Sequence, residues 1–406
     1  MHSESSALFD PARYANVRKP LLDAEGLPAD CYTDARFLQR ELQTVFAASW
    51  LMAGRADRIP KRGDYFTLDY AGANLVVIRD LNQQVRVYAN VCRHRGARLV
   101  SGEGNCRALV CPYHSWTYAL DGQLKGCAGM EETRNFDPAD YGLAEVRSAL
   151  WGSFVFVNID GAAPPLTDWL GELPERLAMY RFDDMAATRV RVHDIDCNWK
   201  TWVENYMEGY HIPTVHRATI SAHKAVNTPE DPSGNGQYRA IFEKHDGTLA
   251  LLPGDAGFPP LETLAGESAR GSRFMLIYPM TMFALTIDAM WTFQCLPMGP
   301  EKTRIIHTSL FPKSRMARDD FEALAANYYK RQDMVVKEDN DITMIQQQGL
   351  RAPMTRPGRF APKEKIVHAL ANWVLDRVLA RPQLKPWHPS GTALAGSVPA
   401  AQGASA

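Results

Sequence analysis

The chain has 406 residues, of which 46% are hydrophobic and 22% are charged, and 45 Lys and Arg against 46 Asp and Glu give a formal net charge of -1. This length holds two or three domains with cores of their own, and the composition is that of a globular protein. The near-neutral charge gives no electrostatic reason to bind nucleic acid or an anionic membrane, so we expect neither partner.

The compartment is predicted from apolar runs and cysteines. No apolar run approaches the roughly 20 residues that span a bilayer. The first residues, Met-His-Ser-Glu-Ser-Ser, lack the basic start and apolar core of a signal peptide, so we expect a cytoplasmic protein. Four of the seven cysteines fall between residues 92 and 127. In a reducing compartment, clustered cysteines bind metal or do redox chemistry more often than they form disulfides.

The first part of the chain predicts a helix followed by a small all-β module. The helix is expected over 35–49, where apolar residues recur three and four positions apart. β-branched and aromatic residues predict strands over 65–70, 75–78, 85–88, 116–120 and 154–159. The Gly-Ala-Ala-Pro-Pro stretch at 161–165 is the expected end of the module.

The second part mixes strands and helices. Alternation predicts a strand over 189–196, and helical spacing predicts a helix over 199–211. Further strands are expected over 237–242, 274–278, 282–287, 291–296 and 304–310, a meander that favours an antiparallel sheet. Long helices are expected over 316–347 and 364–379, and the Ala-, Gly- and Ser-rich tail after them is expected to be disordered.

Two cysteines and two histidines form the first candidate site. Cys92-Arg-His94 and Cys111-Pro-Tyr-His114 each supply one thiolate and one imidazole from a short loop. In a two-iron, two-sulfide centre of the Rieske kind, two thiolates hold one iron and two imidazoles hold the other, which raises the reduction potential. We therefore predict an electron-carrying [2Fe-2S] cluster on these four residues.

A structural zinc site is the alternative, because zinc also binds two cysteines and two histidines. Zinc fingers usually pair Cys with Cys and His with His, whereas here each loop supplies one of each, which favours the cluster. Cys106 and Cys127 have no partner histidine at a matching offset, so we expect them to be packing residues.

A second candidate site lies in the expected helix over 199–211. Glu204, Glu208 and His211 are four and seven positions apart, so one helix face would carry all three. Pro213 is expected to end the helix, which would let His216 fold back towards His211. Two histidines with one carboxylate from elsewhere form the facial triad that binds non-haem Fe(II) and leaves positions open for dioxygen. A solvated acidic helix face is the alternative.

The third metal ligand is expected from the long helix that starts near residue 316. Its acidic cluster contains Glu338, Asp339 and Asp341, and position alone does not select among them. His223 is a further histidine that could compete as a ligand, although a surface position is the expected role for it.

Together the two sites resemble the catalytic α subunit of Rieske non-haem iron oxygenases, over about residues 35 to 380. The strings Asn90-Val-Cys-Arg-His-Arg-Gly96, Cys111-Pro-Tyr-His-Ser-Trp-Thr-Tyr118, Asn198-Trp-Lys200 and Glu204-Asn205 are most similar to the branch of choline, glycine betaine, carnitine and stachydrine oxygenases. Matching Gln347-Gln-Gly349 to that branch places Asp339 on its iron-binding Asp.

Two positions depart from the resemblance. Glu208 stands where most ring-hydroxylating members have Asp, and Met344 stands where members that oxidise quaternary amines usually have Glu. These differences bear on the substrate and leave the iron chemistry unchanged.

The resemblance implies an α+β fold, with a small all-β Rieske [2Fe-2S] domain and a helix-grip catalytic domain built on an antiparallel sheet. The expected division is an N-terminal segment over 1–44 that packs on the catalytic domain, the Rieske domain over 45–160, the catalytic domain over 161–388 and a disordered tail over 389–406.

The resemblance also implies the roles of individual residues. His211, His216 and Asp339 would bind a mononuclear Fe(II). In a head-to-tail homotrimer, Glu208 would bridge His114 of one subunit and His211 of the next, and Glu204 is the second candidate catalytic carboxylate. Because the sequence contains no G-x-G-x-x-G or G-x-x-x-x-G-K-[ST] motif, a separate reductase of the flavin or ferredoxin type is expected to supply electrons from NAD(P)H.

The expected reaction uses O2 to oxidise an N-methyl group of a small quaternary or tertiary amine, which is then demethylated. Tyr206, Tyr278, Phe283 and Trp291 are candidates for an aromatic cage around the ammonium, with a place in the core as the alternative. Hydroxylation of an aromatic ring or aromatic acid is the second candidate reaction. A Rieske electron-transfer protein without oxygenase activity is the third, and it would leave some 240 residues unexplained.

Overall fold

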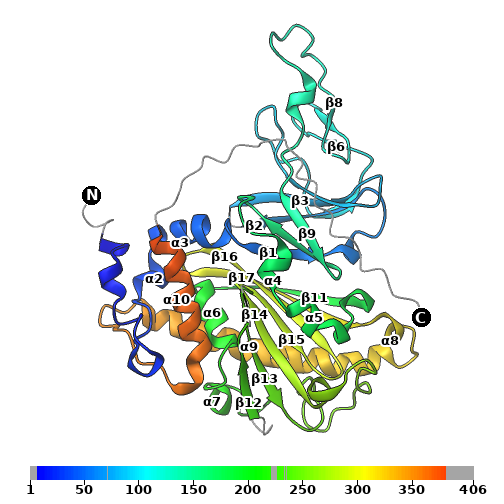
Figure 1. Ribbon diagram of the computed structural model, residues 1–406. Coiled ribbons are helices and arrows are strands. Elements are labelled where there is room, and N and C mark those ends of the chain that lie inside the picture. Colours follow the sequence, from blue (N-terminus) through cyan, green and yellow to red (C-terminus); the bar gives the residue numbers. More distant parts are fainter. Residues whose placement is uncertain (1–6, 71, 221–225, 233, 235, 381–406) are drawn as a thin grey trace.

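The computed structural model describes residues 7–70, 72–220, 226–232, 234 and 236–380. A smaller, all-antiparallel β region sits on one face of a large antiparallel sheet, and long helices cover the other face (Figure 1). This is the mixed α and β fold class that the sequence predicts. The tail expected to be disordered lies outside the described residues, and the domain limits remain a prediction.

The smaller region contains three short sheets. Their strand orders are β1 (Trp50–Arg55), β10 (Phe154–Asn158) and β9 (Arg147–Trp151); β4 (Val85–Ala89), β3 (Ala73–Arg79), β2 (Asp64–Tyr70) and β5 (Glu103–Asn105); and β6 (Leu109–Val110), β7 (Thr117–Tyr118) and β8 (Leu124–Gly126). Alternate residues of β3 face two cores: Leu75 and Val77 join the main core, whereas Val76 and Ile78 join a smaller core with Cys92 and Cys111. The smaller core supports the loops that carry the first candidate site.

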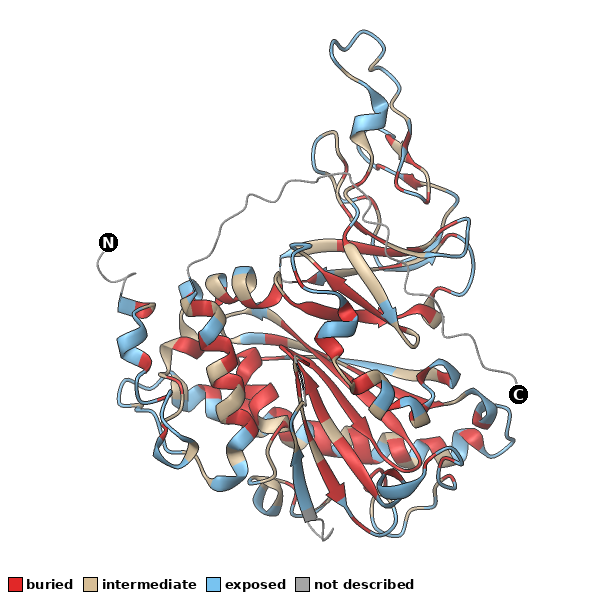
Figure 2. Cartoon of the chain, viewed as in Figure 1, coloured by how far each residue is buried: buried red, intermediate tan, exposed pale blue. Residues whose placement is uncertain are grey.

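The large sheet has seven strands, and every neighbouring pair is antiparallel. Their order is β11 (Met185–Ile195), β17 (Lys302–Pro312), β16 (Met290–Gly299), β15 (Thr281–Leu285), β14 (Gly271–Ile277), β13 (Tyr238–Lys244) and β12 (Val226–Glu230). The middle of this sheet is buried on both faces (Figure 2). On one face, Gln294 of β16 donates a hydrogen bond of 2.5 Å to the carbonyl of Met52 in β1. The two β regions are therefore in direct contact.

The described helices are α2 (Asp30–Thr33), α3 (Ala35–Glu41) continued by a π-helical turn (Leu42–Phe46), α4 (Leu166–Leu170), α5 (Leu173–Arg176), α6 (Trp199–Tyr206), α7 (Ile212–Val215), α8 (Lys313–Met316), α9 (Phe321–Leu350) and α10 (Lys365–Leu379). Of these, α6 and α9 cover the opposite face of the sheet, where they contact Phe274 and Trp291, whereas α5 lies on the same face as the β region. Asn198 caps α6 by accepting a hydrogen bond from the backbone of Lys200, and its own N–H donates to Gln347 of α9 at 2.9 Å. These contacts tie α6 to α9, the two helices that border the second candidate site.

Short 3₁₀ turns complete the described secondary structure. They cover Pro11–Tyr14, Leu21–Asp23, Ala56–Arg58, Pro138–Tyr141, Ala178–Tyr180, Phe182–Asp184, Gly266–Arg270 and Pro362–Glu364. Within the residues that the structure describes, no helix is both long and apolar enough to cross a membrane.

One predicted helix is wrong in its length. The expected helix over 199–211 ends at Tyr206, so Glu208 and His211 lie beyond it and do not share a helix face with Glu204. Pro213 does not end a helix; it lies in the first turn of α7, where a missing N–H costs nothing. The turn between α6 and α7 brings His211 and His216 together in place of a single helix face.

Candidate metal centres

Two loops of matching backbone geometry carry the first candidate site. In the first, the N–H of Gly96 donates to the carbonyl of Cys92 at 3.0 Å, and the N–H of Cys92 donates to Ala97 at 2.8 Å. In the second, Ser115 donates to Cys111 and Cys111 to Trp116, at the same two distances. The fifth residue of each loop, Gly96 or Ser115, has a positive φ. Each loop thus presents one cysteine and one histidine in the same way.

The four side chains point towards one another. The Nδ1 atoms of His94 and His114 are 3.2 Å apart, and both cysteines are buried, with 2% of each exposed. His94 stacks on Trp116, with ring centroids 4.9 Å apart, while His114 is exposed. Two buried sulfurs and two converging imidazoles are the donor set that a mixed-ligand [2Fe-2S] cluster requires. The exposed imidazole edge is the side from which a partner could approach.

The sulfur environment favours a thiolate at Cys111. Burial by itself raises the pKa of the Cys111 thiol, but the N–H groups of Tyr113 and His114 and the side chain of Cys92 lower the pKa below its usual value. Metals bind cysteine as the thiolate, so this loop is prepared for a metal. Cys106 and Cys127 lie at the edge of the smaller core, as packing residues.

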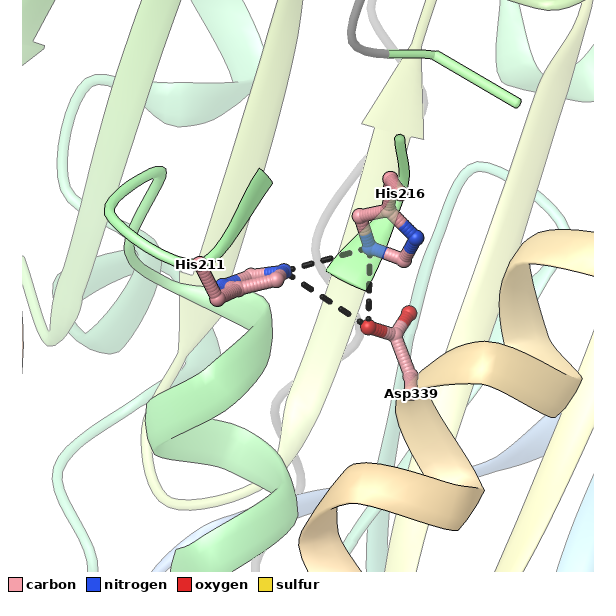
Figure 3. A group of neighbouring side chains, drawn as sticks. All are labelled: His211, His216 and Asp339. Atoms are coloured by element: carbon pink, nitrogen blue, oxygen red, sulfur yellow. Dashed lines mark hydrogen bonds and ion pairs between the residues drawn. The ribbon is translucent and has the colours of Figure 1, made fainter. Parts of the chain in front are cut away.

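Three side chains of the larger region converge on one point. The Nε2 atoms of His211 and His216 are 3.2 Å apart, and Oδ1 of Asp339 lies 3.6 Å and 3.1 Å from them (Figure 3). His211 and His216 flank α7, and Asp339 projects from α9. Two metal bonds of about 2.1 Å at right angles place their donor atoms about 3 Å apart. The three atoms therefore fit one octahedral face of a metal ion.

Two further carboxylates orient the histidines. Oε1 of Glu208 lies 2.5 Å from Nδ1 of His211, and Oε2 of Glu338 lies 2.7 Å from Nδ1 of His216. A carboxylate on Nδ1 fixes the proton there and leaves the Nε2 lone pair free for a metal. Burial by itself lowers the pKa of His216, but Asp339 and Glu338 outweigh it and raise the pKa. The cluster of negative charge favours a cation.

The comparisons with known proteins match both regions. Residues 49–137 match the Rieske [2Fe-2S] domain, and residues 182–380 match the catalytic domain of the ring-hydroxylating α subunit. Choline monooxygenase of Arabidopsis thaliana is 31% identical over 372 residues, which cover 89% of this chain and 83% of the relative. The chain belongs to the Rieske non-haem iron oxygenases. It is an oxidoreductase with a Rieske [2Fe-2S] domain, as the sequence predicts.

Other oxygenases of this family are similar in sequence or in fold. The glycine betaine monooxygenase oxygenase subunit of Chromohalobacter salexigens is 27% identical over 415 residues, covering 93% of this chain and 92% of that one. The quaternary ammonium Rieske monooxygenase CntA with L-carnitine superposes with a TM-score of 0.74 at 24% identity, covering 89% of this chain and 97% of that one. Naphthalene 1,2-dioxygenase from Rhodococcus sp. also gives 0.74, at 19% identity, with coverage of 92% and 99%. These structures share the fold, and the fold does not separate amine from ring substrates.

The sequence leaves three acidic residues of α9 as candidates for the third metal ligand, and the structure shows that their side chains contact different partners. Asp339 lies with the histidines, and Glu338 contacts the far side of His216. Asp341 forms a surface ion pair of 2.5 Å with Lys337, one helical turn away. His223 lies outside the described residues. Glu338 is the residue that sequence reasoning missed as an orienting group, because only the fold shows which helix face meets His216.

Glu204 does not join the three converging side chains. The hydroxyl of Tyr32 donates hydrogen bonds to both of its carboxylate oxygens, at 2.9 and 3.2 Å. Burial raises the pKa of Glu204 to about 7, although Tyr32 and Lys200 lower it. The contact joins α6 to the N-terminal part of the chain and gives Glu204 a structural position.

The four aromatic candidates do not form one cage. Phe283 packs against Phe154 of β10, on the sheet face opposite Trp291, because Trp291 pairs with Ala284 next to it. Tyr278 stacks on Trp373 of α10. Tyr206 lies at the end of α6, where burial raises the pKa of its hydroxyl and Asp339 is near enough to raise it further. The core interpretation therefore holds for Phe283 and Tyr278.

Proposed function

We propose that this oxygenase oxidises an N-methyl group of a small quaternary or tertiary amine and releases the demethylated product. The observation that carries the oxygenase chemistry is the convergence of His211, His216 and Asp339 within 3.6 Å of one another. The amine substrate is supported by the names of relatives, which act on choline and glycine betaine.

His211, His216 and Asp339 would hold a mononuclear Fe(II), and Cys92, His94, Cys111 and His114 would hold the [2Fe-2S] cluster. An iron with three protein ligands on one face has open positions, where it would supply the activation of dioxygen. Glu208 and Glu338 keep both histidines in the tautomer that binds metal through Nε2.

The overall reaction balances with two electrons. The N–CH3 group, O2, two electrons and two protons give N–CH2OH and water. The hydroxymethyl group then loses formaldehyde, and the nitrogen keeps one proton or one lone pair in place of the methyl group. A separate reductase that draws on NAD(P)H is proposed as the electron source, because the sequence has neither nucleotide-binding motif.

Electrons are proposed to pass between subunits of a homotrimer. The cluster loops around β6 and β7 lie at the far end of the molecule from α7, where the candidate iron ligands are (Figure 1). His114 is exposed, and Glu208 keeps 12% of its side chain exposed beside His211. In the proposed assembly, Glu208 contacts the partner's cluster histidine and its own His211, which gives the electron a short hydrogen-bonded path.

The test is NADH-dependent oxygen uptake with a surrogate reductase and a panel of methylated amines. We expect formaldehyde release in proportion to the oxygen consumed. Hydroxylated ring products without formaldehyde would replace this proposal with ring hydroxylation. Electron transfer to acceptors without any substrate oxidation would leave an electron-transfer protein.

A further inference from the structure

Arg331 is a buried cation without a partner. It lies on α9 with 4% of its surface exposed, and its Nε has no hydrogen-bond partner. Among the residues that the structure describes, it forms no ion pair and donates no hydrogen bond; its guanidinium lies 5.1 Å from the ring centroid of Trp291. A buried charge is costly unless it is paired. An anion that is absent from the chain itself would supply the pairing.

Arg331 lies within electrostatic range of Asp339, one of the three converging metal-binding side chains. It lies two helical turns before Asp339 on α9, about 12 Å along the helix axis. Tyr206, which ends α6 just before Glu208, has a hydroxyl without a hydrogen-bond partner. Burial lowers the pKa of Arg331 to about 10, although the nearby Asp339, Tyr206 and Glu243 raise it. A small molecule bound beside Asp339 would therefore be close enough to Arg331 to interact with its positive charge.

Glu243 is the competing partner within the chain. It lies on β13, also buried, and burial raises its pKa to about 7 although Arg331 lowers it. At neutral pH this carboxyl is partly protonated, whereas a guanidinium with a pKa of about 10 stays charged. Arg331 and Glu243 together therefore keep a net positive charge, and no ion pair joins them within the described residues. Glu243 does not complete the site.

We propose that Arg331 binds a carboxylate of the substrate, so that this oxygenase acts on betaines and other acids and discriminates against amino alcohols such as choline. The inference that the substrate also contains an amine rests on the proposed function. In this proposal, Arg331 forms a charge-assisted hydrogen bond to the carboxylate of the substrate. Its guanidinium also stacks on Trp291, so the ring face of Trp291 is not available to bind the ammonium group. Discrimination follows because an alcohol leaves the guanidinium buried and unpaired.

The test compares acids with their matched alcohols on the holoenzyme by calorimetric titration. The probe pairs are glycine betaine with choline, 4-(trimethylammonio)butanoate with the corresponding butanol, and benzoate with benzyl alcohol. We expect at least one acid to bind about tenfold or more tightly than its alcohol. Arg331→Gln should remove that difference and leave alcohol binding unchanged, and Arg331→Lys should keep part of it.

Arg315→Gln is the matched control, because Arg315 is also buried and donates only to backbone carbonyls far from the metal-binding group. It should keep the acid preference. Equal binding of acid and alcohol by the wild type, no binding of any acid, or an equal loss of both in Arg331→Gln would overturn the proposal. If Arg331→Gln does not fold, the wild-type ratios and Arg331→Lys decide. A preference for benzoate with ring oxidation would overturn the amine function and leave the role of Arg331 intact.

Discussion

Two carboxylates hold two histidines in place at the candidate iron site. Glu208 contacts Nδ1 of His211 and Glu338 contacts Nδ1 of His216, so the pair of Nε2 atoms faces Asp339. The two contacts look alike, but they differ in position: Glu208 lies in the turn between α6 and α7, and Glu338 lies on α9. In the proposed trimer only Glu208 also contacts the partner's cluster histidine, so we expect the two carboxylates to have different roles.

Removal of a ligand should empty the mononuclear site alone. We expect His211→Ala and Asp339→Ala to lose about one iron per chain and all turnover, since two ligands hold iron weakly. The Rieske absorbance should be unchanged. Asp341→Ala is the control, because its carboxylate pairs with Lys337 on the surface. Metal analysis with absorption spectra measures both; iron loss in the Asp341 variant but not in the Asp339 variant would reverse the assignment.

Glu208→Gln should keep both metals and lose most of the oxygenation. The amide presents a donor where the carboxylate presented an acceptor, so the proposed path from the partner's cluster to His211 would be broken. Glu338→Gln should instead weaken iron binding by about 10- to 100-fold, and the iron that remains should still receive electrons. Single-turnover kinetics with a pre-reduced cluster separates the two. Full activity of Glu208→Gln would refute the bridge.

Glu204 should make stability depend on pH. Its folded pKa of about 7 lies above the ordinary value of 4.5. The folded state therefore binds the proton more tightly, and the stabilisation is complete below about pH 4.5 and is lost as the pH rises through 7. Glu204→Gln should match the wild type at pH 4.5 and be more stable by about 1 to 3 kcal/mol at pH 8.5.

Urea denaturation at the two pH values measures this difference. Glu175→Gln serves as the control, because Glu175 is exposed; the difference in stability between this variant and the wild type should be the same at both pH values. A Glu204 variant that is less stable than the wild type at pH 8.5 would show that the ionised carboxylate stabilises the fold.

At the scale of elements, the sequence predicted both long helices and every strand of the large sheet except β12, because their apolar patterns extend over many residues. It failed where the chain turns. The end of α6 at Tyr206 has one local signal, Gly209 shortly after it, but apolar residues at 207 and 210 continue the helical spacing. Short strands such as β6 and β8 have two or three residues and too little pattern to detect.

The two cluster loops offer an element-scale test. Gly96 and Ser115 occupy equivalent positions with φ of 76° and 56°. A Cβ on Gly96 meets no atom within 4 Å, so Gly96→Ala should cost only the conformational strain, about 1 kcal/mol. Ser115→Gly should relieve a similar strain. The temperature at which the cluster absorbance bleaches should fall in the first variant and rise in the second; a fall in both would contradict the shared loop geometry.

At the scale of the whole molecule, the order of the motifs predicted two metal sites and the family. The convergence of His211, His216 and Asp339 joins residues more than 120 positions apart, and only the resemblance selected Asp339 from its acidic neighbours. The proposed role of Arg331 could not be predicted from the sequence, because the sequence does not show that this arginine is buried and has no ion-pair partner among the described residues.

In the proposed homotrimer, the cluster of one chain reduces the iron of the neighbouring chain. Co-expression of Cys111→Ala, which lacks the cluster, with His211→Ala, which lacks the iron, tests it most directly. Each variant alone should be inactive, because every chain in it lacks the same metal. Random mixing in head-to-tail trimers pairs an intact cluster with a neighbouring intact iron at about a quarter of the interfaces, so we expect about a quarter of wild-type activity per chain. Mixed trimers that carry both metals and remain inactive would contradict it.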